Sequence, residues 1–198
     1  MADVATHPGL RRAVRWVVAL KLGYFGIEFA VALAIGSVAL FADSIDFLQD
    51  AAVNLLVMLG MAWSLRQRAR LGMALAAALL VPALAALWTV WEKLMVPVAP
   101  APMALTLAGT GALAVNVACT LMLARYRSHG CCLTRAAFLS VRNDVLSNLA
   151  IITAGLVTAH LWPSAWPDLI VGLGIAAMNA DAAREVWTAA REEHRAAA

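Results

Sequence analysis

Long apolar runs dominate this sequence, and their length restricts the chain to very few folds. An apolar stretch of about 20 residues can cross the roughly 30 Å hydrocarbon core of a bilayer as a helix. We mark off six such runs, at residues 14–36, 37–65, 71–96, 103–125, 135–161 and 165–187. Only 14% of the 198 residues are charged, against about 25% in soluble domains. The sequence therefore predicts an integral membrane protein.

Helices are the expected form of all six runs. A backbone in contact with lipid must satisfy its own hydrogen bonds, and the runs lack the alternation of polar and apolar residues that marks a barrel strand. We predict an all-α membrane protein whose domain of six transmembrane helices covers residues 14–187. Segment 1–13 precedes this domain and a short tail, 188–198, follows it. No second domain is expected.

The basic residues indicate how the helices are oriented, because Lys and Arg accumulate in short cytoplasmic connections. They gather around the start of the first run, between the second and third, around the end of the fourth and at the end of the chain: Arg11, Arg12, Arg15, Arg66, Arg68, Arg70, Arg125, Arg127, Arg191 and Arg195. In a six-span layout these segments all lie on one side, and the other side has only Lys93. Both termini are therefore predicted to be cytoplasmic, in a multi-pass protein of the plasma (inner) membrane. The net charge of +3 reflects this topology and indicates no nucleic-acid partner.

The second run carries a stripe of polar residues, Asp43, Asp46, Asp50 and Asn54. At about 100° per residue, these side chains fall within an arc of about 80° on one helix. Asp43 lies near the expected start of the helix, where a carboxylate can act as a cap. We interpret Asp168, which follows a proline at the start of the sixth run, as a cap in the same way.

A second polar stripe occupies the fifth run, where Ser140, Asp144, Ser147 and Asn148 share an arc of about 100°. Asp144 lies near the middle of its run, as Asp50 does in the second run. Each of the two stripes belongs to the middle run of a three-run half, and the two halves would cross the bilayer in opposite directions. This arrangement is typical of a 3+3 inverted repeat with a binding site at the midplane.

Carboxylates at the centre of a bilayer are costly and need a partner. A divalent cation is the simplest such partner. The axes of packed helices lie about 8–10 Å apart, so carboxylates on facing helices can converge on a single ion. Lys21 and Glu28 are seven residues apart on the first run, and we interpret them as members of an ion-pair network. For Asn54 and Asn148, hydrogen bonding between helices and metal ligation both remain open.

Two segments resemble a known family. GSVALFADSIDFLQD, residues 36–50, resembles the second-helix signature of the cation diffusion facilitator (cation efflux) family of metal–proton antiporters. WPDLIVGLGIA, residues 166–176, resembles the opening of the family's sixth helix, and the resemblance covers all six runs. It implies a secondary transporter, not an enzyme, that exports a divalent metal cation (Zn, Co, Mn or Fe type) from the cytoplasm in exchange for protons. The implied partners are the metal, protons, the bilayer and a second copy in a homodimer, with no cofactor besides the transported ion.

The resemblance also implies a site. In the family, the second helix supplies an acidic or His residue and an Asp four positions later, and the fifth helix supplies a His or Asp and an Asp at the same spacing. Asp46 and Asp50 match the first pair, and Asp144 matches the last ligand. Ser140 replaces the usual His or Asp, and oxygen ligands alone favour harder ions such as Mn²⁺, Fe²⁺ or Mg²⁺. Asn143 is a candidate for a further amide oxygen, so the expected metal site comprises Asp46, Asp50, Asp144, Ser140 and Asn143.

Three alternatives stand beside this interpretation. Ser140 and a tail too short for the family's cytoplasmic metal-binding domain both suit a non-transporting membrane protein that binds metal as a sensor or assembly subunit. A proton-coupled carrier of a small organic cation would use the same carboxylates. An intramembrane enzyme is the least supported, because Ser/Lys and His/Glu arrangements are lacking, although two aspartates on different helices are also found in aspartyl proteases.

Overall fold

The computed structural model describes residues 8–60, 84–124 and 133–179. The described helices are α1 (Pro8–Ile35), α2 (Val38–Gly60), α4 (Pro102–Ala124) and α5 (Leu133–His160), with shorter helical segments at 84–95 and 166–179. No β-strand occurs within these ranges, so the expected all-α fold class is confirmed. The arginines at 66–70, 125, 127, 191 and 195 and the tail 188–198 lie outside the described residues.

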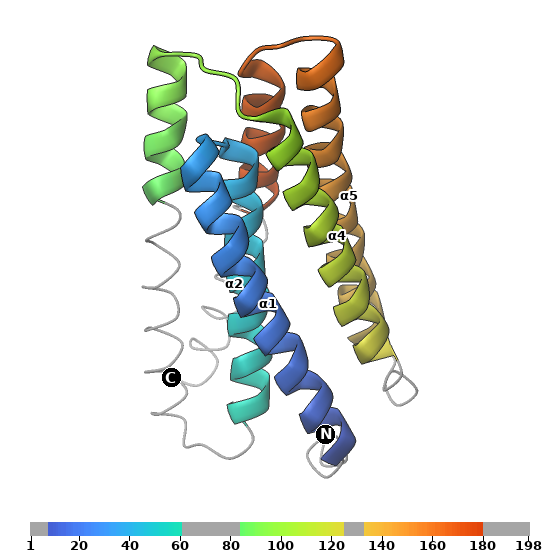
Figure 1. Cartoon of the computed structure of the whole chain (residues 1–198). Coiled ribbons are helices and arrows are strands. Elements are labelled where there is room, and N and C mark those ends of the chain that lie inside the picture. Colours follow the sequence, from blue (N-terminus) through green and yellow to red (C-terminus); the bar gives the residue numbers. More distant parts are fainter. Residues whose placement is uncertain (1–7, 61–83, 125–132, 180–198) are drawn as a thin grey trace.

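The helices lie side by side, and consecutive helices run in opposite directions (Figure 1). α1 packs along α2 and α4 packs along α5, which makes two antiparallel pairs. α1 also contacts α4, whereas α2 and α5 touch over only a short stretch. The connections at 36–37, 96–101 and 161–165 all lie at one end of the bundle, the upper end in Figure 1.

A two-residue turn joins α1 to α2. Gly36 has a φ of 62°, a left-handed conformation that costs glycine little and that ends α1. Ser37 then caps α2, because its hydroxyl oxygen accepts a hydrogen bond from the backbone N–H of Leu40 at 3.1 Å. The turn therefore fixes α1 and α2 as an antiparallel hairpin.

Glycines let two of the helix pairs approach closely. A Cβ at Gly155 of α5 would lie 2.3 Å from the hydroxyl of Thr106 on α4. A Cβ at Gly172 would lie 2.7 Å from the backbone nitrogen of Ala39, at the start of α2. In lipid, no hydrophobic driving force brings helices together, so their association depends on close packing. Small residues such as these glycines allow that packing.

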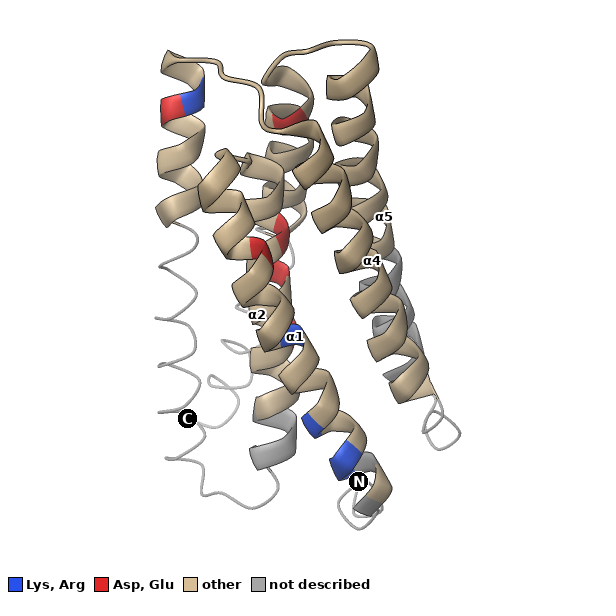
Figure 2. Ribbon diagram, in the orientation of Figure 1, with Lys and Arg blue, Asp and Glu red and all other residues tan. Residues whose placement is uncertain are grey.

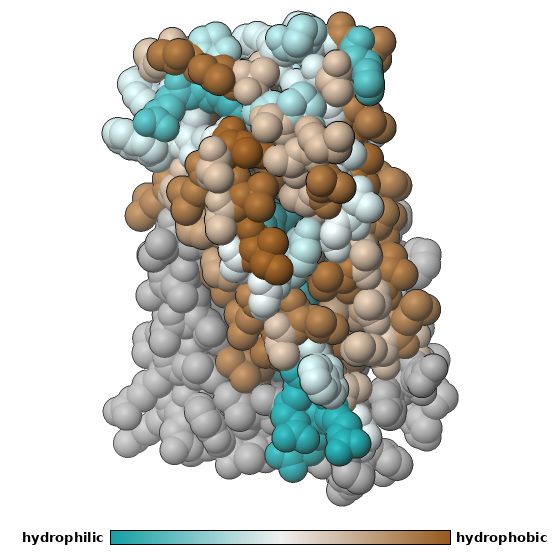
Figure 3. All heavy atoms as spheres, in the orientation of Figure 1, coloured by the Kyte–Doolittle hydropathy of each residue, from teal (hydrophilic) through white to brown (hydrophobic). Residues whose placement is uncertain are grey.

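The surface of the bundle is mainly apolar. Many large hydrophobic side chains, including Trp16, Leu107, Leu121 and Ile170, are exposed, and apolar residues cover most of the described face in Figure 3. Residues Arg11–Ile35 and Pro102–Ala124 form helices that are long and apolar enough to cross a membrane. The interior is built from small and aromatic side chains such as Ala32, Ala39, Phe41 and Ala108.

Candidate functional site

Lys21 is the centre of a polar network inside the bundle. It lies near the middle of α1, and its side chain is only 5% exposed. The ammonium forms an ion pair with Asp50 of α2 and lies 3.5 Å from the carboxylate of Asp144 on α5. It also donates a hydrogen bond of 2.6 Å to the side-chain oxygen of Asn116 on α4. One cation thus contacts side chains of three other helices.

The packing of the helices explains why these groups meet. Asp50, Asn116 and Asp144 all lie near the middle of their helices, at the level of Lys21. Because α1 touches both α2 and α4, its lysine can reach into the space between the α1–α2 and α4–α5 pairs. The ring of Phe47 packs against the ammonium, with 4.7 Å between the nitrogen and the ring centroid, and adds a cation–π contact.

The two aspartates are not fully enclosed. The side chain of Asp50 is 29% exposed and that of Asp144 is 17% exposed, although their lysine partner is buried. Each therefore keeps an accessible edge. One group of acidic residues lies at mid-height in the bundle, and others lie near its upper end, where a basic residue is also found (Figure 2).

The remaining expected ligands have different positions. Asp46 is half-buried and lies within electrostatic range of Asp43, Asp50 and Asp144, beside Asn179. Asn143 is exposed. Ser140 belongs to α5, but its side chain is outside the described part of the structure. In the described ranges, no three His, Cys, Asp or Glu side chains form a ready-made metal cage.

Asn54 and Asn148 bond to their own helices. The amide of Asn54 donates to the backbone oxygen of Asp50 at 2.8 Å, and the amide of Asn148 donates to that of Asp144 at 2.5 Å. Each asparagine therefore holds the turn that carries a site aspartate. Among the described residues, these amide nitrogens form no hydrogen bond between helices, which was one of the two roles left open by the sequence.

The expected ion-pair network is present for Lys21 but does not include Glu28. Two helical turns separate these residues by about 10 Å along the axis, and the ammonium is drawn to other helices instead. Glu28 faces Asp43 of α2, and both carboxylates are completely buried. No other side chain in the described segments donates a hydrogen bond to them.

Capping was also assigned incorrectly to Asp43. α2 begins at Val38, so Asp43 lies inside the helix, and Ser37 is the residue that caps it. Asp168 is a cap, as expected, but of α2 rather than of its own helix. Its carboxylate accepts hydrogen bonds from the backbone N–H groups of Val38 at 2.9 Å and Ala39 at 3.2 Å.

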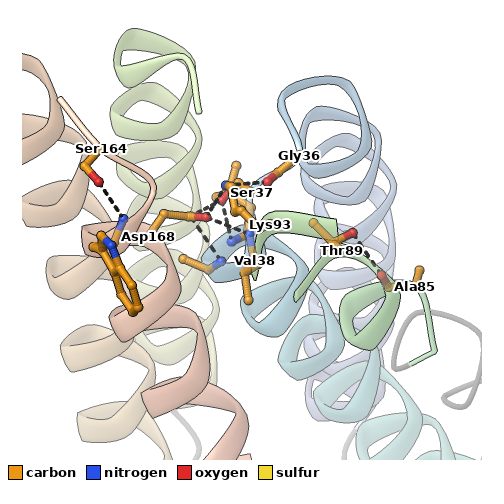
Figure 4. A network of polar contacts seen from close by, with 11 residues as sticks. Gly36, Ser37, Val38, Ala85, Thr89, Lys93, Ser164 and Asp168 are labelled. Carbon is orange, nitrogen blue, oxygen red and sulfur yellow. Dashed lines mark hydrogen bonds and ion pairs between the residues drawn. The ribbon is translucent and has the colours of Figure 1, made fainter. Parts of the chain in front are cut away.

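Asp168 has two further partners, which complete a second network at the end of the bundle (Figure 4). The hydroxyl of Ser37 donates to it at 2.5 Å, and the ammonium of Lys93 lies 2.7 Å away. Lys93 also donates to the backbone oxygen of Gly36 at 2.5 Å. We call Lys93, Asp168, Ser37 and Gly36 the end lock, because they tie the α1–α2 turn to segments 84–95 and 166–179.

A cavity of about 490 Å³ opens beside the end lock and not at the Lys21 network. Its walls include Gly36, Trp88, Glu92 and Lys93, and none of the expected metal ligands. The two described tryptophans of the third run are exposed there.

Sequence reasoning missed two members of the central network, Lys21 as a partner of the aspartates and Asn116. A signal for Lys21 was present, since a lysine in the middle of an apolar run is functional by default. Asn116 is the one amide side chain of α4, the most apolar of the helices α1, α2, α4 and α5, and a lone amide in such a helix is the signal that marks it.

Comparison with known families agrees with this geometry. The family model described as the cation efflux transmembrane domain matches residues 14–192, a range that includes both networks. No curated protein matches the sequence. The described bundle, its apolar surface and its buried charges suit a transmembrane domain that handles cations. The chain therefore belongs to the cation efflux (cation diffusion facilitator) family of membrane metal-cation transporters.

Proposed function

We propose that the protein exports a divalent metal cation from the cytoplasm in exchange for protons, with Asp50 and Asp144 as the principal ligands. The position of Lys21 carries this proposal. α2 and α5 each present one carboxylate to a single ammonium in the interior of the bundle. Two anionic side chains that already hold one cation between helices have the charge and the placement to hold a metal cation once the ammonium withdraws.

Further ligands come from the same region. Asp46 is the proposed third carboxylate, because it lies on the same face of α2 and near both principal ligands. Asn116 supplies an amide oxygen that already points to the cation position. Ser140 and Asn143 remain additional candidates on α5. An all-oxygen set of this kind favours Mn²⁺, Fe²⁺ or Mg²⁺ over the softer Zn²⁺.

Proton exchange follows from the chemistry of carboxylate ligands, which must lose their protons before they bind metal. Metal that enters from the cytoplasm releases these protons, and a more acidic exterior returns them and competes the metal off. We therefore expect the metal affinity of the protein to be lower at acidic pH than at neutral pH.

The proposal places six spans across the plasma membrane with both termini in the cytoplasm, in a 3+3 inverted arrangement and as a homodimer. The alternating helix directions support this topology. So do the charges, since the described connections at 36–37, 96–101 and 161–165 contain no Lys or Arg, whereas α1 begins with Arg11, Arg12 and Arg15.

Metal uptake into everted membrane vesicles with an acidic lumen tests the function. The full chain is compared with Asp50→Asn and Asp144→Asn for Zn²⁺, Mn²⁺, Co²⁺ and Fe²⁺. We expect uptake that depends on the pH gradient in the wild type and its loss in both variants. Glu92→Gln is the matched control, because Glu92 is an exposed carboxylate away from the network, and its removal leaves uptake unchanged.

Two results would contradict the proposal. Uptake that survives Asp50→Asn and Asp144→Asn would move the transport site elsewhere. Metal binding without uptake in the wild type would instead favour the sensor or assembly role.

A further inference from the structure

Lys21 occupies the position at which the proposed cargo would bind. Its ammonium has three N–H donors, and three oxygens surround it, from Asp50, Asn116 and Asp144. These are the oxygens that the metal proposal needs. An ammonium and a metal cation cannot share them, because the two positive charges repel one another at such short range.

The ammonium of Lys21 compensates only part of the negative charge of Asp50 and Asp144. Once both aspartates have lost their protons, as metal binding requires, they bring −2 and the ammonium brings +1, so the deprotonated network keeps an unbalanced negative charge. A divalent cation in place of the ammonium would bring the two aspartates to zero. A monovalent cation in the same place would bring only the charge that the lysine already supplies.

The lysine is enclosed, whereas its two carboxylate partners are partly accessible. Its stem is buried and its ammonium rests against Phe47, which keeps it in position without a metal. Asp50 and Asp144 keep accessible edges, from which an entering ion can approach. The long, flexible side chain of a lysine can withdraw its charge along the helix surface without any change in the backbone.

We propose that Lys21 is a tethered cation that competes with the cargo for Asp50 and Asp144 and thereby selects divalent over monovalent ions. The inference rests on the proposed function, because it takes these aspartates as the cargo ligands. A divalent ion gains charge balance when it displaces the ammonium, whereas Na⁺ or K⁺ gains none. When the cargo leaves, the ammonium returns, so the bilayer interior never holds two uncompensated carboxylates.

Removal of the competing charge is the first test. Binding of Mn²⁺ and Zn²⁺ to the purified full chain is measured by calorimetry for the wild type, Lys21→Met and Lys21→Arg. We expect Lys21→Met to bind Mn²⁺ at least about tenfold more tightly and to become sensitive to competing Na⁺. Lys21→Arg keeps a tethered charge and stays near the wild type. Unchanged or weaker binding by a folded Lys21→Met would overturn the inference.

A second test uses the unmodified protein and does not depend on how the variant folds. The sequence has two lysines, Lys21 and Lys93, and both are buried in polar networks. Amine-specific labelling, read by mass spectrometry with and without Mn²⁺, reports each of them. We expect Mn²⁺ to increase the labelling of Lys21 several-fold and to leave Lys93 unchanged.

The outcomes separate the two proposals. Metal binding with no change in Lys21 labelling and no tightening in Lys21→Met would overturn the competition but leave the transport function intact. A wild type that neither binds nor takes up any of the metals would overturn both.

Discussion

The two lysines of this chain form networks of similar composition and opposite character. At the end lock, Lys93 meets a carboxylate that is completely buried and accepts from four donors, Ser37, Val38, Ala39 and Lys93 itself. In the central network, Lys21 faces two partly exposed carboxylates on helices that barely touch. A buried ion pair is rigid where every lone pair is satisfied, and exchangeable where water reaches an unsatisfied edge.

Replacing an aspartate by asparagine in each network should give the largest difference between the two. Asp168→Asn places an amide N–H₂ against the N–H donors of α2 and removes the ion pair of Lys93, which keeps only the backbone oxygen of Gly36. We expect it to lower the free energy of unfolding in detergent by about 3–5 kcal/mol, the range for a buried pair that loses one partner. Asp50→Asn costs far less, because Lys21 keeps Asp144 and Asn116. Equal losses at the two sites would mean that the central network is as structural as the end lock.

Transport should respond in the reverse order. We expect Asp144→Asn to reduce initial uptake rates by more than the roughly 10–100-fold that loss of a group supporting a metal site costs. Those Asp168→Asn molecules that remain folded keep most of their uptake, because the end lock touches no ligand. Rates per folded molecule, with the folded fraction taken from size-exclusion chromatography, check this order. A folded Asp168→Asn protein without uptake would connect the lock to the transport site.

A smaller loss of stability is expected from a substitution at Gly172, where two backbones pack closely beside the end lock. A Cβ at Gly172 meets the backbone of α2, which cannot move aside easily, so Gly172→Ala should cost about 1–3 kcal/mol of unfolding free energy. Gly174 lies two residues further along the same segment with nothing within 4 Å of a Cβ. Gly174→Ala is the matched control and should be neutral or stabilising by about 0.5–1 kcal/mol. Similar losses in both variants would show that helix propensity, and not contact with α2, is being measured.

The smallest change is expected at Glu28. It faces Asp43 with no other described donor nearby, and two adjacent carboxylates repel one another when both are ionised. Glu28→Gln introduces an amide donor for Asp43, so the free energy of unfolding should change by no more than about 1 kcal/mol, with a gain as the favoured direction. Thermal unfolding followed by tryptophan fluorescence measures it. A loss of several kcal/mol would mean that the carboxylate of Glu28 has a partner beyond the described residues.

Local features made the helices predictable. Residue 36 was expected to end the first helix because it is the last residue of an apolar run, and its left-handed backbone ends α1 there. The fourth and fifth helices also lie within two residues of their expected bounds. The proximity of Asp50 and Asp144 could be predicted because each aspartate lies near the middle of its run. This depth in the membrane does not depend on how the two helices pack.

Partners across helices were not predictable. The seven-residue spacing of Lys21 and Glu28 indicates a shared face, but it says nothing of which other helix brings a carboxylate closer. Asp168 has the sequence context of a cap, yet the helix start that it caps is 130 residues away. Such choices depend on how α1, α2 and the segment at 166–179 pack, and no local pattern encodes that.

The end lock also has a mechanical meaning. It joins three segments at one end of the bundle, and Asp50 lies twelve residues along α2 from that end, about 18 Å away at 1.5 Å per residue. Any tilt of α2 about this end would therefore move Asp50 more than it moves the residues near Val38. A tilt of about 10° displaces Asp50 by about 3 Å, enough to part a carboxylate from an ammonium. Holding one end of α2 in this way makes the distance between Asp50 and Lys21 sensitive to small changes in the tilt of the helix.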